Sequence, residues 1–285
     1  LQKLSQQQLF RASDPTVAIN QVLTLWFVLA QWPETRTYVT QHPELLDVLR
    51  QVAERHMHNL QLSLHVCDLL TVLTANNQQL NEMCGPAGLC VSVVRILERH
   101  YQARFDGAVI ASVGCVLIRC LAVVPANLVR LSQAGACELL PATLVRHAED
   151  DSTSFQCLQT IHMLAASHAE NTLILGRSGA CEAVLQLLAS RIERPAFAEG
   201  CLRTMSILCC NNAVNAERLY EARISQLLLR VFQLHMEVSG TMIWAIAAIA
   251  NMCTGTESAR VTELGEAGLC PAVVAALATH LQSHE

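Results

Sequence analysis

Five histidines recur along the chain at one spacing, and their residue type could bind a metal ion. These histidines are His56, His100, His147, His235 and His280, separated by 44, 47, 88 and 45 residues. Arg191 occupies the equivalent position in the middle of the long interval. Equivalent side chains on stacked helices lie about 8–10 Å apart, whereas two nitrogens on one zinc ion need to lie within about 4 Å of each other. We therefore expect no metal site. The histidines are interpreted as donors to the carbonyls that end a helix, with a pH-sensitive surface as the alternative.

The 13 cysteines are the second residue type that could do chemistry. They are scattered through apolar segments, and neither Cys209 with Cys210 nor Cys115 with Cys120 has the Cys-x-x-Cys spacing of metal ligands. An odd number in so long a chain is typical of reduced, buried thiols. Four cysteines follow a glycine and an apolar residue, and we expect all four to be buried: Cys90, Cys137, Cys181 and Cys270.

Sequence motifs that build catalytic centres are absent. The chain has no Gly-x-Ser-x-Gly elbow, phosphate-binding loop, dinucleotide-binding glycine fingerprint or His-Glu-x-x-His helix. We therefore expect no catalytic residues, no cofactor and no enzymatic activity. The acidic run at residues 149–151 is expected in a solvated loop, with contact to a partner as the alternative.

The elements that carry these residues repeat. Each Gly-apolar-Cys triplet begins with a glycine that we call a landmark: Gly88, Gly135, Gly179 and Gly268, which are 47, 44 and 89 residues apart. Arg223 lies at the middle of the long interval, where a landmark glycine is missing. A short polar helix precedes each landmark. A second helix, a polar break and a longer third helix follow it. We expect one repeat domain over residues 1–285, with an incomplete unit at 1–43, repeats near 44–87, 88–134, 135–178, 179–222 and 223–267, and the helix of a truncated unit at 268–285.

Residues 170–209 show the expected unit. A short helix ends near residue 175, Gly179 turns the chain with a positive φ, a second helix covers residues 183–188, and a third covers residues 198–210. Such helices cannot bury their apolar faces alone, so neighbouring units must stack.

Composition agrees with an all-α fold. Apolar residues make up 52% of the 285 residues, charged residues 15% and aromatic residues 4%, and no series of alternating strands with tight turns is present. A net charge of −5 disfavours nucleic acid as a partner. The most apolar stretch, residues 108–124, contains Arg119 and ends at Pro125, so we expect no membrane span. Without a signal segment, and beginning at Leu1, the chain is expected to be a piece of a longer intracellular, cytoplasmic protein.

Three segments resemble the armadillo repeat family. Residues 170–181 resemble its short first helix and glycine junction, residues 267–271 keep the proline of that junction, and residues 245–252 are similar to the end of its third helix. The resemblance covers about 240 residues of this chain. It implies a right-handed α-solenoid of three-helix repeats whose third helices line a peptide-binding groove. HEAT repeats, which lack the short first helix and the glycine landmark, are the second choice.

The groove residues follow from this resemblance. In the nuclear-import branch of the family, third-helix asparagines grip the peptide backbone, and here only Asn251 keeps the amide at that position. A nuclear-transport adaptor is therefore a weaker alternative. The expected groove residues are polar or exposed positions of the third helices: Asp68, Thr71, Arg119, Gln159, His162, Glu199, Arg203, Ser206, Trp244 and Asn251. The alternative is that these side chains are only solvated.

These observations predict a scaffold that binds a protein or peptide segment in extended form along the groove. A second alternative is an effector-sensing, autoinhibitory domain of a multidomain enzyme. That alternative requires a small-molecule effector between helices, for which no residue pattern gives support.

Overall fold

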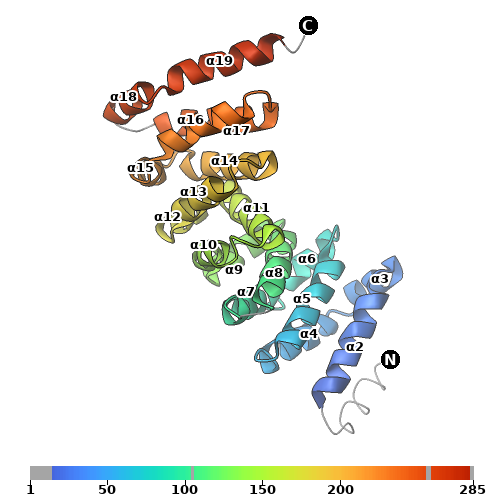
Figure 1. The fold of residues 1–285 in the computed structure, drawn as a ribbon. Coiled ribbons are helices and arrows are strands. Elements are labelled where there is room, and N and C mark those ends of the chain that lie inside the picture. Colours follow the sequence, from blue (N-terminus) through green and yellow to red (C-terminus); the bar gives the residue numbers. More distant parts are fainter. Residues whose placement is uncertain (1–14, 104–105, 255–257, 283–285) are drawn as a thin grey trace. The chain divides into compact units, whose positions relative to one another are not determined.

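The structure, a computed structural model, describes residues 15–103, 106–254 and 258–282. The described residues are all-helical: 83% of them are helix, and they form 18 helices and no strand. These helices gather into two compact units, Leu1–Ala136 and Cys137–Glu285, and each unit is described by itself. Figure 1 labels the helices in chain order.

Unit 1 contains the helices α2 (Pro15–Leu29), α3 (Pro33–Gln41), α4 (Glu44–Arg55), α5 (Leu60–Thr74), α6 (Gln78–Cys84), α7 (Leu89–His100), α8 (Gly107–Ala122) and α9 (Pro125–Gln133). Unit 2 contains α10 (Ala136–Arg146), α11 (Asp151–Ser167), α12 (Ala169–Arg177), α13 (Ala180–Arg191), α14 (Pro195–Cys209), α15 (Ala213–Glu221), α16 (Ile224–His235), α17 (Ser239–Cys253), α18 (Ser258–Glu266) and α19 (Leu269–Gln282).

The helices follow one order in both units. A short helix is followed by a second helix and then by a longer third helix, as in α12, α13 and α14, which have 9, 12 and 15 residues. Third helices of neighbouring repeats pack on one another, for example α5 on α8 in unit 1 and α14 on α17 in unit 2. Each unit is therefore a stack of repeated three-helix modules.

Second helices begin at left-handed turns. The landmark glycines have φ values of 80°, 96°, 89° and 92°, which confirms the predicted positive φ at Gly88, Gly135, Gly179 and Gly268. Arg223 keeps the same backbone without glycine, at φ 59°. A left-handed conformation costs a residue with a Cβ about 1–2 kcal/mol, so the geometry of the turn is retained in this repeat at a cost in stability.

Side chains also mark helix starts. Asn59 accepts a hydrogen bond from Leu62 N at the start of α5 (3.1 Å), and Asn212 accepts one from Asn215 N at the start of α15 (3.1 Å). Such caps satisfy backbone donors that have no partner within the helix. The polar breaks of the sequence therefore coincide with these helix boundaries.

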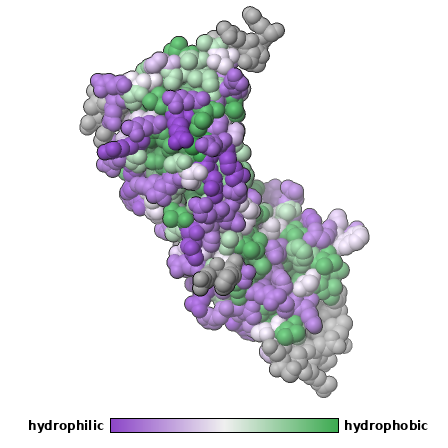
Figure 2. Space-filling view, in the orientation of Figure 1, coloured by the Kyte–Doolittle hydropathy of each residue, from purple (hydrophilic) through white to green (hydrophobic). Residues whose placement is uncertain are grey.

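The core is built from aliphatic side chains and thiols. Cys90, Cys137 and Cys181 are buried as predicted, but the prediction for Cys270 is wrong because its residue is exposed. In the part of the chain that the structure describes, α19 packs against α16, α17 and α18, and Val274 and Leu277 of the same helix are exposed together with Cys270. Hydrophobic residues reach the surface among hydrophilic ones within each unit (Figure 2).

No single helix among the described residues has both the length and the apolar character needed to cross a membrane. The apolar stretch near Arg119 forms α8, which has 16 residues. Two bent pairs, α6 with α7 and α12 with α13, reach that length and composition only when taken together across bends of 76° and 72°.

Candidate functional site

The third helices α11, α14 and α17 of unit 2 pack side by side, α14 lying between the other two in contact. Seven predicted groove residues lie on them: Gln159, His162, Glu199, Arg203, Ser206, Trp244 and Asn251. Ser206 is buried and the other six are partly exposed. We call these six residues the third-helix surface.

His162 and Arg203 lie close together at the α11–α14 contact. The pKa of His162 is lowered, first by burial and then by the positive charge of Arg203, while a hydrogen bond with the backbone of Arg203 acts in the opposite direction. His162 Nδ1 and Arg203 Nε are both buried and have no hydrogen-bond partner. Two buried nitrogens therefore meet here without the hydrogen-bond partner that buried polar groups normally have.

Glu199 precedes Arg203 by one helical turn, but the two side chains form no ion pair within 4.0 Å. The Glu199 carboxylate lies instead against Gly240, in the space that a Cβ at Gly240 would occupy. Gly240 is in the first turn of α17, where the helix dipole favours an anion. The acidic group closest in sequence is thus directed away from Arg203.

Asn251 and Ser206, which the sequence places at equivalent repeat positions, contact each other. Asn251 Nδ2 donates to Ser206 O (2.9 Å) and to Ser206 Oγ (3.0 Å). The Asn251 amide nitrogen therefore links α17 to α14. This contact was not foreseen, because the resemblance assigns the amide to a bound peptide.

In unit 1, Asp68 and Thr71 lie on α5 and Arg119 lies on α8, which packs against α5. Burial raises the pKa of Asp68, and the nearby His65 partly offsets this effect. Thr71 Oγ1 donates to Cys67 O of its own helix (2.8 Å). Burial also lowers the pKa of Arg119. Asp68 and Thr71 thus lie on the helix that packs against the helix of Arg119.

Sequence reasoning missed apolar members of the same surface. Ile243 is 61% exposed and precedes Trp244 on α17. Met163 and Ile207 are partly exposed and follow Gln159 and Arg203 by one turn. Helical spacing from the polar positions was the signal that could have found Met163 and Ile207.

His100, His235 and His280, together with Arg191, bind carbonyls of the preceding repeat rather than of their own helix. The ring Nε2 of His100 lies 2.7 Å from Met57 O, that of His235 lies 2.6 Å from Ile192 O, and that of His280 lies 2.9 Å from Met236 O. Arg191 Nη2 donates to Ala148 O (3.2 Å). Because a carbonyl oxygen only accepts, each ring Nε2 is the donor. The prediction of a carbonyl partner is confirmed, and its assignment to the residue's own helix is wrong. We call these bonds the second-helix ladder.

Buried asparagines of the first helices make a second set of repeat-to-repeat bonds. Asn127 Nδ2 donates to Asn81 O in unit 1 (2.5 Å), and Asn215 Nδ2 donates in unit 2 to Thr172 O (3.1 Å) and to Leu208 O (2.8 Å). Gly176 gives Asn215 its room, because a Cβ there would collide with Asn215 Oδ1. Polar groups of the first and second helices thus hold the repeats together.

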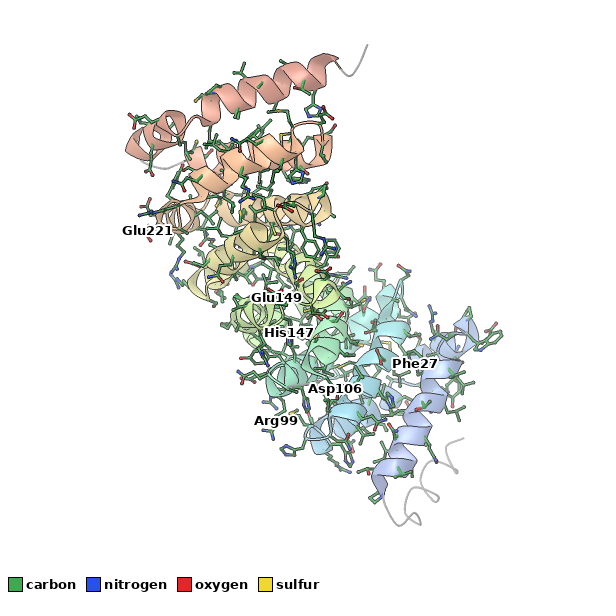
Figure 3. All side chains as sticks on the ribbon, in the orientation of Figure 1. Phe27, Arg99, Asp106, His147, Glu149 and Glu221 are labelled. Atoms are coloured by element: carbon green, nitrogen blue, oxygen red, sulfur yellow. The ribbon has the colours of Figure 1, made fainter. Side chains whose placement is uncertain are left out.

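The acidic run is not simply solvated. Asp150 caps α11 by accepting from Thr153 N (2.7 Å), and this bond with that of the Thr153 side chain holds its pKa below the usual range. Asp151 pairs with Arg194, and Arg191 lies 3.5 Å from Glu149 and 3.4 Å from Asp151. Glu149 and His147 mark this loop between α10 and α11 in Figure 3. The loop therefore neutralises the arginine that replaces a ladder histidine.

Metal chemistry finds no support in the described residues, among which no group of three or more His, Cys, Asp or Glu side chains could hold an ion. Burial raises the pKa of Cys67 and of Cys84 to about 12. These thiols stay protonated and are poor nucleophiles.

Comparison with known proteins gives a fold. No family model matches the chain, and no curated protein matches it. Three solved structures, all of engineered proteins, are similar: the Northeast Structural Genomics Consortium targets OR329, OR366 and OR497, with TM-scores of 0.68, 0.67 and 0.73 and identities of 13%, 15% and 14%. The matches cover 87%, 87% and 98% of this chain and 95%, 97% and 67% of the respective structures. At such low identity the likeness concerns the fold alone: the chain is an all-helical protein similar to engineered helical proteins of repeat-like build.

Proposed function

We propose that this chain is a non-enzymatic, intracellular protein-binding domain of the armadillo type, a right-handed solenoid that binds a partner segment along its third helices. Support for the type comes from the short first helix and from the left-handed landmark turns, which recur at the starts of α7, α10, α13, α16 and α19. The partner is a protein or peptide in extended form, since side-chain amides, charges and apolar groups of the third helices can hold such a segment.

One observation carries the proposal: on the neighbouring third helices α11 and α14, two buried nitrogens without a hydrogen-bond partner lie close together. Asn215 on a first helix and His235 on a second helix bind backbone carbonyls of the preceding repeat. His162 Nδ1 and Arg203 Nε on the third helices have no such partner. Because buried polar groups are normally hydrogen-bonded, an acceptor from another molecule is the missing component.

A random peptide display library selected on the full chain tests the proposal. We expect enriched peptides whose affinity falls about tenfold in Ile243→Ser and in Arg203→Gln, since exposed anchors and arginines dominate such interfaces. Ile243 is suited to this test because it is 61% exposed, so its replacement leaves the fold intact.

Arg230→Gln is the matched control, because Arg230 is an exposed arginine on the second helix α16 of the same unit. Equal loss in Arg230→Gln, or unchanged affinity in both third-helix variants, would contradict the proposal. Circular dichroism spectra of the variants verify that each retains its helices.

A further inference from the structure

We infer that the partner is an acidic segment and that one of its side-chain carboxylates binds between His162 of α11 and Arg203 of α14. This inference rests on the function proposed above and names the chemistry of the segment that the third-helix surface recognises.

Arg203 differs from four other arginines of unit 2. Those four lie within 4.0 Å of a carboxylate oxygen: Arg191, Arg194, Arg218 and Arg230. Among the described residues, no such ion pair involves Arg203. A guanidinium donates five N–H groups and accepts none. The Nε of Arg203 and the Nδ1 of His162 are buried without a hydrogen-bond partner, as are the Nε atoms of Arg191 and Arg218, so Arg203 differs from those two in having no carboxylate of the described residues within 4.0 Å. A carboxylate offers two oxygens that accept hydrogen bonds from such groups.

The chain itself does not supply that carboxylate. Glu199 is one turn from Arg203 on α14, but its carboxylate lies against Gly240 in the first turn of α17. Glycine at position 240 is what admits the carboxylate, since a Cβ would occupy the same space. The anion of the chain and the cation of the chain are thus separated on one helix, which leaves the cation for a ligand.

Glu199 also restricts the kind of anion. A phosphoryl group carries a charge of about −1.5 to −2 at neutral pH, and the chain as a whole carries a net charge of −5. Repulsion by Glu199 penalises a dianion more than a monoanion. A carboxylate of Asp or Glu is therefore favoured over a phosphorylated side chain.

Binding at this position is coupled to the protonation of His162. Burial and the charge of Arg203 hold the pKa of His162 below its usual value, so the ring of the free protein is mostly neutral at neutral pH. A carboxylate between the two residues offsets the charge of Arg203 and favours the protonated ring. Affinity must then increase as the pH falls, because the complex takes up a proton.

The helices in contact with α11 carry several other charged side chains. Besides Asp151 at the start of α11 itself, the charged side chains on α10, α12 and α14, the helices in contact with α11, are Glu138, Arg146, Glu170, Arg177, Glu199 and Arg203. Only Arg203 perturbs the titration of His162.

The test uses an enriched peptide from the display library and the full chain. Each acidic residue of the peptide is changed to its amide, one at a time, and each peptide is titrated against the original chain and Arg203→Gln. One acidic position is expected to lose about tenfold or more in affinity with the original chain and to lose nothing further with Arg203→Gln, as in a double-mutant cycle.

The pH dependence gives a second readout. Affinity of the original chain is expected to rise several-fold from about pH 8 to about pH 6, and His162→Gln should remove most of this rise while still binding. His168→Gln is the control, since His168 is exposed at the start of α12. The pKa of His162, followed by NMR, should increase when the peptide binds.

The outcomes separate the two proposals. Peptides that require Ile243 and Arg203 but contain no coupled acidic position, or that bind equally at all pH values, overturn this inference and leave the proposed function in place. A preference for phosphorylated over carboxylate side chains at the coupled position overturns it as well. If the library yields no peptide at all, the proposed function fails, and this inference fails with it.

Discussion

His235 and His162 lie in the same unit but have opposite surroundings. His235 is buried on a second helix, and its Nε2 lies 2.6 Å from Ile192 O of the preceding repeat. His162 is partly exposed on a third helix, and its Nδ1 has no partner. One residue type thus binds a carbonyl of the preceding repeat in the ladder, whereas at the third-helix surface one of its two ring nitrogens has no partner. The difference teaches that the helix a polar residue occupies, more than its type, indicates its role in this fold.

The comparison can be tested first at Asn215. Asn215→Ala removes two bonds to buried backbone carbonyls and leaves a cavity, so we expect a loss of about 3 kcal/mol in the free energy of unfolding. Urea denaturation of the full chain measures it. Gln226→Ala, at an exposed position of α16, should change stability by less than about 0.5 kcal/mol. Equal stability of the two variants would show that the first-helix asparagines do not hold the repeats together.

Gly176 tests the space that the same asparagine needs. Alanine is a better helix former than glycine by about 1 kcal/mol, but its Cβ at position 176 would collide with Asn215 Oδ1. We expect Gly176→Ala to lose about 2 kcal/mol of stability as Asn215 is displaced. Gly265→Ala, whose Cβ meets only ordinary contact with Cys270 Sγ at 3.7 Å, should not destabilise the chain. A stable Gly176→Ala would mean that the stacked helices shift easily.

The two histidines can be compared directly. His235→Leu leaves the carbonyl of Ile192 without its donor and should cost about 1–2 kcal/mol, measured by thermal or urea unfolding. His162→Leu removes one nitrogen that has no partner and one hydrogen bond with the backbone of Arg203 at a partly exposed position, so it should cost less than His235→Leu. The contrast between ladder and surface would be wrong if both variants lost the same stability.

The smallest expected effect is on the pH dependence of stability. The folded-state pKa of His162 lies below its unfolded value, so the unfolded chain takes up a proton first as the pH falls below about 6.5. This lowers stability progressively until the pH reaches the folded-state pKa. His162→Gln should therefore lose less stability than the original chain between about pH 7 and pH 5, whereas His168→Gln should behave like the original chain. An unchanged pH profile in His162→Gln would contradict the lowered pKa.

Local features of the fold could be predicted from the sequence. Glycine spacing predicted the left-handed turns, and the helices expected at residues 183–188 and 198–210 are present as α13 (Ala180–Arg191) and α14 (Pro195–Cys209). Both features depend on backbone preferences and on apolar periodicity within a short segment. The repeat position of Arg223 was predicted, but its left-handed backbone was not, because its residue type gives no sign of a positive φ.

Contacts between repeats could not be predicted in the same way. The partner of His235, the bond between Asn251 and Ser206 and the placement of Glu199 against Gly240 all depend on how one helix is offset along its neighbour. The spacing of residues along the sequence gives the length of the repeat, but it does not give the offset between neighbouring helices. The exposure of Cys270 was missed for a related reason, because its repeat position predicts burial only where a neighbour covers it.

The second-helix ladder has a consequence for how unit 2 melts. Its links at Arg191, His235 and His280 each join one repeat to the repeat before it. Free energy in such a stack is shared only between nearest neighbours. A broken central link at His235 would therefore split one cooperative transition into two, whereas a broken link at His280 would merely let the last helices fray.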